Sequence, residues 1–239
     1  MALPISSPLI LVLAFMVGII PSLFWLWFWL REQEEPEPMG LLAIVFIMGM
    51  IAVMVVLPIQ KFIQGHVSSN ELDIVLWAAT EEVCKYLAVL VILYKTNYAD
   101  KPIDWPIYLI AAALGFATLE NALFLIKPFS TLNETTSLLT VASLGQLRFL
   151  GSTLLHTISS GVIGIVMGIS FYMDEWKKKW YLFGGFLVAI VLHSVFNFFI
   201  IRNNGNDFLK VFAFLWVVTI IIMLLFEKVR RMSEQLLIN

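Results

Sequence analysis

Long apolar runs separated by short polar segments follow one another along the whole chain. Seven of these runs are close to the length of about 20 residues that a helix needs to cross the hydrocarbon core of a bilayer. They cover residues 7–30, 39–59, 73–94, 105–126, 148–173, 180–201 and 208–226. The pattern predicts an all-α protein, a polytopic transmembrane bundle of about seven spanning helices. We expect one membrane-embedded domain over residues 1–239, in which residues 73–201 carry the motifs described below.

The composition supports the membrane interpretation. Of the 239 residues 60% are hydrophobic and only 13% are charged, and the mean hydropathy is +0.91. Too few polar residues remain to cover a water-exposed surface. The net charge of -2 argues against nucleic acid as a partner. The lone cysteine, Cys84, excludes an internal disulfide and a cysteine-based metal site, and we expect it to be a small core residue.

The distribution of Lys and Arg predicts the orientation, because cytoplasmic loops carry an excess of them. One side of the predicted bundle holds nine: Arg31, Lys95, Lys101, Lys177, Lys178, Lys179, Lys228, Arg230 and Arg231. The other side holds five: Lys61, Lys127, Arg148, Arg202 and Lys210. We therefore expect an integral membrane protein with its N-terminus outside and its C-terminus in the cytoplasm. Residues 137–147 are apolar but short, so they either lie at the interface or extend the fifth helix.

Several ionisable or amide side chains fall within the predicted spans, where charged groups are costly and usually functional. They are Glu81, Glu82 and Lys85 in the third span, Glu120 and Asn121 in the fourth, His156 in the fifth, and His193 and Asn197 in the sixth. The third histidine, His66, falls in a predicted loop, where a solvated side chain is expected.

Four of these groups share one predicted depth. Each lies seven to nine residues from a charged residue at the outer end of its helix, which is about 10–14 Å at 1.5 Å per residue. The pairs are Asp73 and Glu82, Lys127 and Glu120, Arg148 and His156, and Arg202 and His193. Structural polar residues have no reason to agree in depth, so the pattern predicts a site. Small residues at Ala111, Gly115, Gly164 and Gly168 would let the helices approach closely.

Two routes of hydrolysis fit this set of residues. Two histidines and a carboxylate are the ligands of many catalytic zinc sites, with a further Glu as general base. Without a metal, a carboxylate in an apolar environment can activate water, while His and Asn stabilise the oxyanion. Glu81 and Lys85 are four residues apart and can form an ion pair along the helix. Glu82 points about 100° away from Glu81, which predicts different roles for the two carboxylates.

Each group taken alone also has a structural explanation. Glu81 and Lys85 could be a structural salt bridge, His156 a core histidine, and His193 with Asn197 an interhelical hydrogen bond. Two other functions stay open for the set as a whole. An ion- or proton-coupled transporter would use acid–imidazole chains as a relay. A non-catalytic membrane scaffold would use the polar layer only to hold helices together. The shared depth favours the enzyme.

The motifs resemble those of a known protease family. Glu81-Glu82-x-x-Lys85, Phe116-x-x-x-Glu120-Asn121, His156 before a run of small residues, and His193-x-x-x-Asn197 occur in this order on successive helices. They resemble the PrsW family of membrane-embedded proteases, in the superfamily of the CAAX prenyl endopeptidases and bacteriocin-immunity proteins. The CAAX branch has Arg one place after Lys85 and usually His in place of Glu120. The chain is thus more similar to PrsW.

The resemblance implies a prokaryotic membrane peptidase, of metallo or glutamate type, that cuts membrane-anchored protein substrates near the outer face. Such substrates include single-pass anti-sigma factors, whose cleavage starts a signalling cascade. On this basis Glu82 or Glu81 is the general base, and Lys85 keeps the other carboxylate ionised. Glu120, His156 and His193 are then ligands of zinc or another divalent metal, or they polarise the substrate if no metal binds. Asn197 and Asn121 orient neighbours or stabilise the oxyanion.

Overall fold

The computed structural model describes residues 7–31, 37–94, 96–130, 151–202 and 208–234, and every regular element in these ranges is a helix. The described helices are α1 (Ser7–Leu30), α2 (Met39–His66), α3 (Asn70–Leu93), α4 (Asp104–Ser130), α6 (Thr153–Ile169), α7 (Glu175–Arg202) and α8 (Phe208–Glu234). The all-α prediction is therefore confirmed. Five of these helices, α1, α2, α4, α7 and α8, are long and apolar enough to cross a membrane. The other two helices do not combine this length and apolarity: α3 carries charges at its centre, and α6 has only 17 residues.

Most described helices extend past the apolar runs seen in the sequence. The second run was expected to end at residue 59, but α2 continues to His66, so the prediction of a loop around this histidine is wrong. Similarly, α7 begins at Glu175 and α8 ends at Glu234. A helix keeps its backbone hydrogen bonds where it enters the polar zone of a bilayer. A run of apolar residues in the sequence ends at the edge of the hydrocarbon, so it marks only part of the helix. Residues 137–147 and Arg148 lie outside the described residues.

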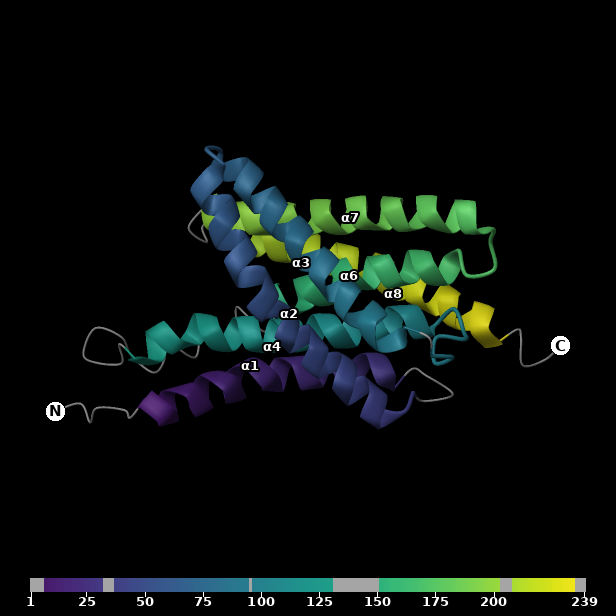
Figure 1. The fold of residues 1–239 in the computed structure, drawn as a ribbon, viewed down its shortest axis with the longest axis horizontal. Coiled ribbons are helices and arrows are strands. Elements are labelled where there is room, and N and C mark those ends of the chain that lie inside the picture. The colour runs from purple at the N-terminus through teal and green to yellow at the C-terminus, as the bar shows by residue number, and fades with distance from the viewer. Residues whose placement is uncertain (1–6, 32–36, 95, 131–150, 203–207, 235–239) are drawn as a thin grey trace.

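Helix α4 is the centre of the bundle (Figure 1). It packs against α1, α2 and α6, and 72% of the residues in its most apolar stretch of 18 residues are buried inside the protein. The close approach depends on glycines, as the sequence suggested. A Cβ atom on Gly115 of α4 would clash with the backbone of Phe46 in α2, and one on Gly49 of α2 would clash with the backbone of Ala112. Gly164 of α6 meets the backbone of Pro106 in the same way.

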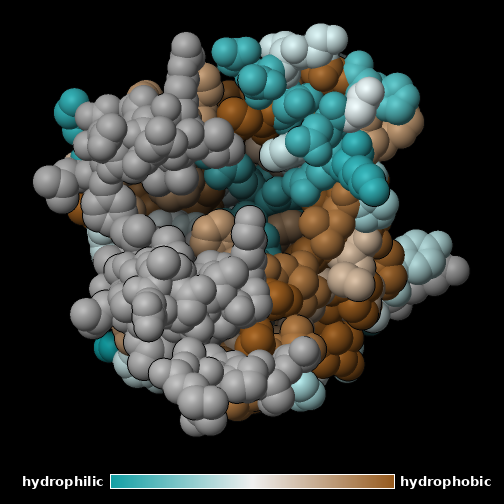
Figure 2. Space-filling view, turned by 90° about the vertical axis from the view of Figure 1, so that its left-hand side faces the viewer, coloured by the Kyte–Doolittle hydropathy of each residue, from teal (hydrophilic) through white to brown (hydrophobic). Residues whose placement is uncertain are grey.

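The outer surface of the bundle is apolar. Large hydrophobic side chains are exposed along α1, α2, α7 and α8, among them Ile20, Met54, Val191 and Leu224. Such a surface is suited to lipid chains. Figure 2 looks onto one end of the molecule, where hydrophilic residues lie together in the upper part and hydrophobic residues lie below them.

Helix α3 returns through the bundle after a short turn and is fixed at its start by a polar cap. The Ser69 hydroxyl accepts a hydrogen bond from the backbone N–H of Leu72 at 3.4 Å, and Glu71 and Asp73 lie in the first turn. Both features stabilise the beginning of a helix. From this start α3 packs against α2 and α7, which places its charged middle inside the protein.

The packing of α2 on α4 gives a first prediction. We expect Gly49→Ala to lower the free energy of unfolding by about 1–3 kcal/mol or more, because the new methyl group forces two backbones apart. Thermal unfolding of the purified protein in detergent measures this effect. Gly184→Ala is the matched control, since nothing lies within 4 Å of a Cβ atom at this position of α7. Equal stability of the two variants would contradict the close contact.

Candidate active site

Three charged residues of α3 lie inside the bundle. Glu82 and Lys85 are each 0% exposed, and Glu81 is 6% exposed. The ammonium of Lys85 also lies 4.5 Å from the centre of the Phe116 ring on α4, in the geometry of a cation–π contact. Buried charges are stable only when paired and hydrogen-bonded.

The carboxylate of Glu82 is fully engaged. Its Oε1 atom lies 2.7 Å from Nζ of Lys85 and 2.8 Å from Nδ1 of His193 on α7. Its Oε2 atom accepts a hydrogen bond of 2.6 Å from the hydroxyl of Ser160 on α6. One buried carboxylate thus joins three helices. The carboxylate accepts from Nδ1–H of His193, so in the neutral ring Nε2 is the nitrogen that carries the lone pair.

The carboxylate of Glu81 is only half engaged. Its Oε1 atom accepts a hydrogen bond of 2.8 Å from the amide of Gln60 on α2. Its Oε2 atom is buried and has no hydrogen-bond partner in the described part of the chain. This oxygen lies 3.5 Å from Nε2 of His193 and 3.8 Å from Nδ1 of His156. A buried acceptor without a donor is costly, so this oxygen is the atom of the cluster that is open to a further donor or ligand.

The second imidazole, His156 of α6, lies between Lys85 and Glu120. Its Nδ1 atom is 2.8 Å from Nζ of Lys85, and its Nε2 atom is 3.0 Å from Oε2 of Glu120. An ammonium only donates, so Nδ1 of His156 accepts and Nε2–H donates to the carboxylate. The rings of His156 and His193 lie 5.0 Å apart. Glu120 also accepts a hydrogen bond of 3.2 Å from Ser152.

The structure therefore brings together six of the seven side chains proposed as catalytic: Glu81, Glu82, Lys85, Glu120, His156 and His193. The seventh, Asn197, is half-buried one turn after His193 and makes no hydrogen bond to these six among the described residues. Asn121 instead donates to Thr153, at 2.9 Å. The sequence predicted an ion pair between Lys85 and Glu81. In the structure the close partner of Lys85 is Glu82, whereas Glu81 lies 3.9 Å away.

Comparisons with known proteins identify the family. Residues 37–226 match the PrsW family of intramembrane metalloproteases. This match covers well over half of the chain and includes all seven side chains proposed as catalytic. The chain belongs to the PrsW family.

Several bacterial proteases named PrsW are similar to the chain. The one from Geobacillus kaustophilus is 29% identical over 162 residues, which cover 66% of each protein. The one from Shouchella clausii is 29% identical over 68% of this chain and 70% of the relative. The one from Oceanobacillus iheyensis is 26% identical over 93% of this chain and 97% of the relative. No solved structure matches the chain.

The PrsW family is described as a family of metalloproteases, so some residues of the site are candidates to hold a metal. Within the described residues, one cluster offers three suitable donors: Glu81, His156 and His193, whose ligand atoms lie within 4.8 Å of one another. Ligands of a tetrahedral zinc ion lie about 3.4 Å apart. The spacings of 3.5 and 3.8 Å from Glu81 to the two rings are close to this value. The sequence-based set had Glu120 in place of Glu81.

The partners of the two rings decide how well this triad fits a metal. His193 donates from Nδ1 to Glu82, so its Nε2 is oriented as in many metal sites, where the second nitrogen of the ligand binds a carboxylate. The unprotonated Nδ1 of His156, however, accepts a hydrogen bond from Lys85. The three donors are of the right chemical type for a divalent metal, but the ammonium of Lys85 opposes a cation at the His156 ring.

Two residues of this PrsW site were not expected from the sequence as partners of the acids. Gln60 lies 21 positions before Glu81, and Ser160 lies 78 positions after Glu82. No spacing within one helix predicts such pairs. Ser160 and Ser152 each lie one helical turn from His156, and their hydroxyls donate to the carboxylates of Glu82 and Glu120 rather than to an imidazole.

Two adjacent serines of α6 give a prediction about the network. Ser159 and Ser160 are both 0% exposed, but only Ser160 donates to Glu82, and Ser159 has no partner for its hydroxyl among the described residues. We expect Ser160→Ala to destabilise the protein by about 1–3 kcal/mol, because a buried carboxylate oxygen loses its donor. Ser159→Ala should be neutral or slightly stabilising. Thermal unfolding of both variants tests this difference, and a larger loss for Ser159→Ala would contradict it.

Proposed function

We propose that this PrsW family member hydrolyses peptide bonds of membrane-anchored proteins, and that Glu81 is the group that activates the attacking water. The observation that carries this assignment is the unpartnered, buried Oε2 atom of Glu81, which faces both imidazoles. A water at this point would satisfy the oxygen and lie within reach of His193 and His156. The water is then held by the base that takes its proton.

Glu82 is unsuited to the same task. Both of its oxygens already accept hydrogen bonds from Lys85, His193 and Ser160, and the side chain is fully buried. Its role is to fix the imidazole of His193 and to compensate the charge of Lys85. Of the two bases that the sequence leaves open, Glu82 or Glu81, these contacts favour Glu81.

The remaining polar residues position the reacting groups. Glu120 accepts from Nε2–H of His156 and so sets the orientation of that ring. Lys85 lies 3.9 Å from Glu81, so its charge acts on the carboxylates of both acids. Asn197 is one helical turn from His193 and half-buried, and we assign it to the oxyanion that forms when water attacks the peptide carbonyl.

A divalent metal would be held by Glu81, His156 and His193, and it would supply a polarised, more acidic water. In that case Oε2 of Glu81 would be a ligand of the metal, so the role of Glu81 as the base belongs to the metal-free protein. Elemental analysis of the purified protein, with and without chelator, distinguishes a metalloprotease from a glutamate protease.

The substrate class follows from the surroundings of the site. The residues lie in helices that pack side by side within an apolar bundle, so a substrate has to be presented from the membrane. A single-pass protein such as an anti-sigma factor is the substrate we propose, with cleavage near the outer face and signalling as its consequence. The end face with hydrophilic residues is the route by which water would enter (Figure 2).

Isosteric substitutions of the two acids distinguish chemistry from stability. We expect Glu81→Gln to lower cleavage of a membrane-tethered reporter by about 10²–10⁴-fold, with little change in the unfolding temperature. We expect Glu82→Gln to destabilise the protein by about 3–5 kcal/mol, because Lys85 loses its close charge partner. Cleavage and thermal unfolding are measured on the same purified samples.

Glu71→Gln is the control for this pair, since Glu71 is exposed in the first turn of the same helix. A stable Glu81→Gln variant that cuts at the wild-type rate would refute the proposal. A stable and active Glu82→Gln variant would refute the division of roles.

The contact between α2 and α3 gives a prediction about positioning. Gln60→Met keeps the length of the side chain but removes the N–H that holds Oε1 of Glu81, and we expect kcat to fall about tenfold with KM little changed. Gln64→Met is the matched control, one turn further along α2 and exposed. Equal kinetics of the two variants would show that Gln60 does not orient the base.

A further inference from the structure

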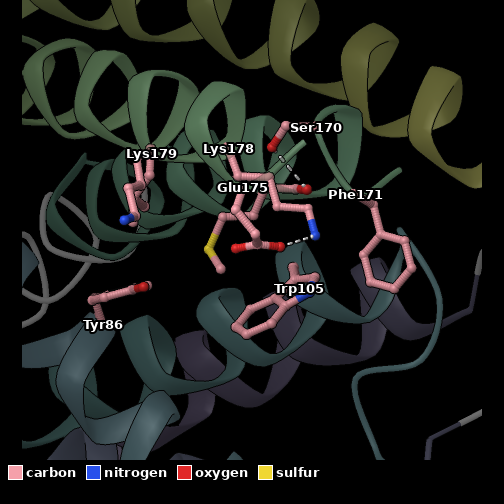
Figure 3. Close-up of a pocket in the computed structure, with 9 residues that line it drawn as sticks. Tyr86, Trp105, Ser170, Phe171, Glu175, Lys178 and Lys179 are labelled. Carbon is pink, nitrogen blue, oxygen red and sulfur yellow. Dashed lines mark hydrogen bonds and ion pairs between the residues drawn. The ribbon is translucent and has the colours of Figure 1, made fainter. Parts of the chain in front are cut away.

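A second polar site is lined by residues outside the cluster of acids and imidazoles. A cavity of about 310 Å³ is lined by residues of α3, α4, α6 and α7 and by the turn between α6 and α7 (Figure 3). Met167 of α6 and Ser170, directly after this helix, contribute to it, 11 and 14 residues after His156. At 1.5 Å per residue the α6 wall of the cavity is therefore about 16 Å or more from that ring, whereas Tyr86 on the α3 wall directly follows Lys85. It shares no residue with the site described above.

Exposed aromatic side chains place this cavity at the level of lipid headgroups. Tyr172, Trp176 and Trp180 flank it on the α6–α7 turn and the first turns of α7, and they are 55, 68 and 57% exposed. Exposed Trp and Tyr residues gather at the boundary between hydrocarbon and water. The cavity accordingly lies where the headgroups of one leaflet meet the protein, on the side that the Lys and Arg count predicts to be cytoplasmic.

The lining of the cavity combines an apolar wall with a cationic rim. Trp105, Met167 and Leu182 form the apolar part. At the rim, Lys178 is neutralised by Glu175, at 2.7 Å. Lys179 lines the same cavity and has no ion-pair partner among the described residues. One uncompensated positive charge therefore remains beside an apolar surface (Figure 3).

We propose that this cavity binds the headgroup of an anionic phospholipid. The phosphate lies against Lys179, with the hydroxyl of Tyr86 on the opposite wall as a second donor. The first methylene groups contact Trp105 and Leu182, and the acyl chains continue over exposed apolar residues of α7 such as Phe183 and Leu187. Basic pockets between helices at a membrane surface commonly hold such headgroups. The bound lipid would link α3 and α4 to the α6–α7 turn.

Native mass spectrometry of the full-length protein in detergent, titrated with phosphatidylglycerol, phosphatidylcholine or inorganic phosphate, tests the proposal. We expect phosphatidylglycerol to bind best and Lys179→Gln to weaken its binding about fivefold, the effect of one lysine near a membrane surface. Lys177→Gln is the matched control, because Lys177 belongs to the same basic run but pairs with Asp174 at 3.4 Å and does not line the cavity. Leu182→Trp, which fills the cavity, should also abolish the preference.

Each contrary result overturns the proposal in its own way. Equal losses for Lys177→Gln and Lys179→Gln would show attraction to a charged surface without a site. Equal binding of phosphatidylcholine would show that the net charge of the lipid is not recognised. Binding of inorganic phosphate as tight as that of the lipid would make the ligand a free anion, and an unaffected Leu182→Trp variant would place the lipid elsewhere. None of these measurements depends on proteolysis.

Discussion

The hydrogen bonds to the carboxylate of Glu82 are the interactions on which the rest of the site depends. It is completely buried, and it accepts hydrogen bonds from Lys85 within α3, from His193 of α7 and from Ser160 of α6. A charge at this depth is tolerated only because all of these donors reach it. Its presence thereby fixes the relative positions of three helices, and with them the direction in which His193 presents its free nitrogen.

The two neighbouring acids show how burial and hydrogen bonding can divide roles. Glu81 and Glu82 are adjacent in sequence, but one carboxylate is saturated with donors and the other keeps an oxygen without a partner. The saturated acid connects three helices, whereas the open oxygen of Glu81 lies near His156 and His193. The donors around each carboxylate therefore distinguish the two acids, which a pattern of two consecutive glutamates does not.

The central helix explains why the polar groups can meet at all. Gly49 and Gly115 let the backbones of α2 and α4 touch, and Gly164 does the same for α6 and α4. Close contact of this kind is a main source of stability between helices in a membrane, where the hydrophobic effect does not drive association. It also brings Glu120 of α4 within 3.0 Å of His156. The close packing of small residues therefore holds these helices together and also brings their polar side chains into contact.

The sequence by itself determined the helical class, because a chain in lipid has to satisfy its backbone internally and its apolar runs have spanning length. It also singled out the acids and histidines, since charged residues inside such runs are rare enough to be noticed. Tertiary structure alone decided the partners: Gln60 for Glu81, Ser160 for Glu82, and Glu82 in place of Glu81 as the close partner of Lys85. Helical periodicity fixes the face on which a side chain lies, but the rotation and crossing of neighbouring helices fix which atom it meets. The candidate metal triad changed from Glu120 to Glu81 for the same reason.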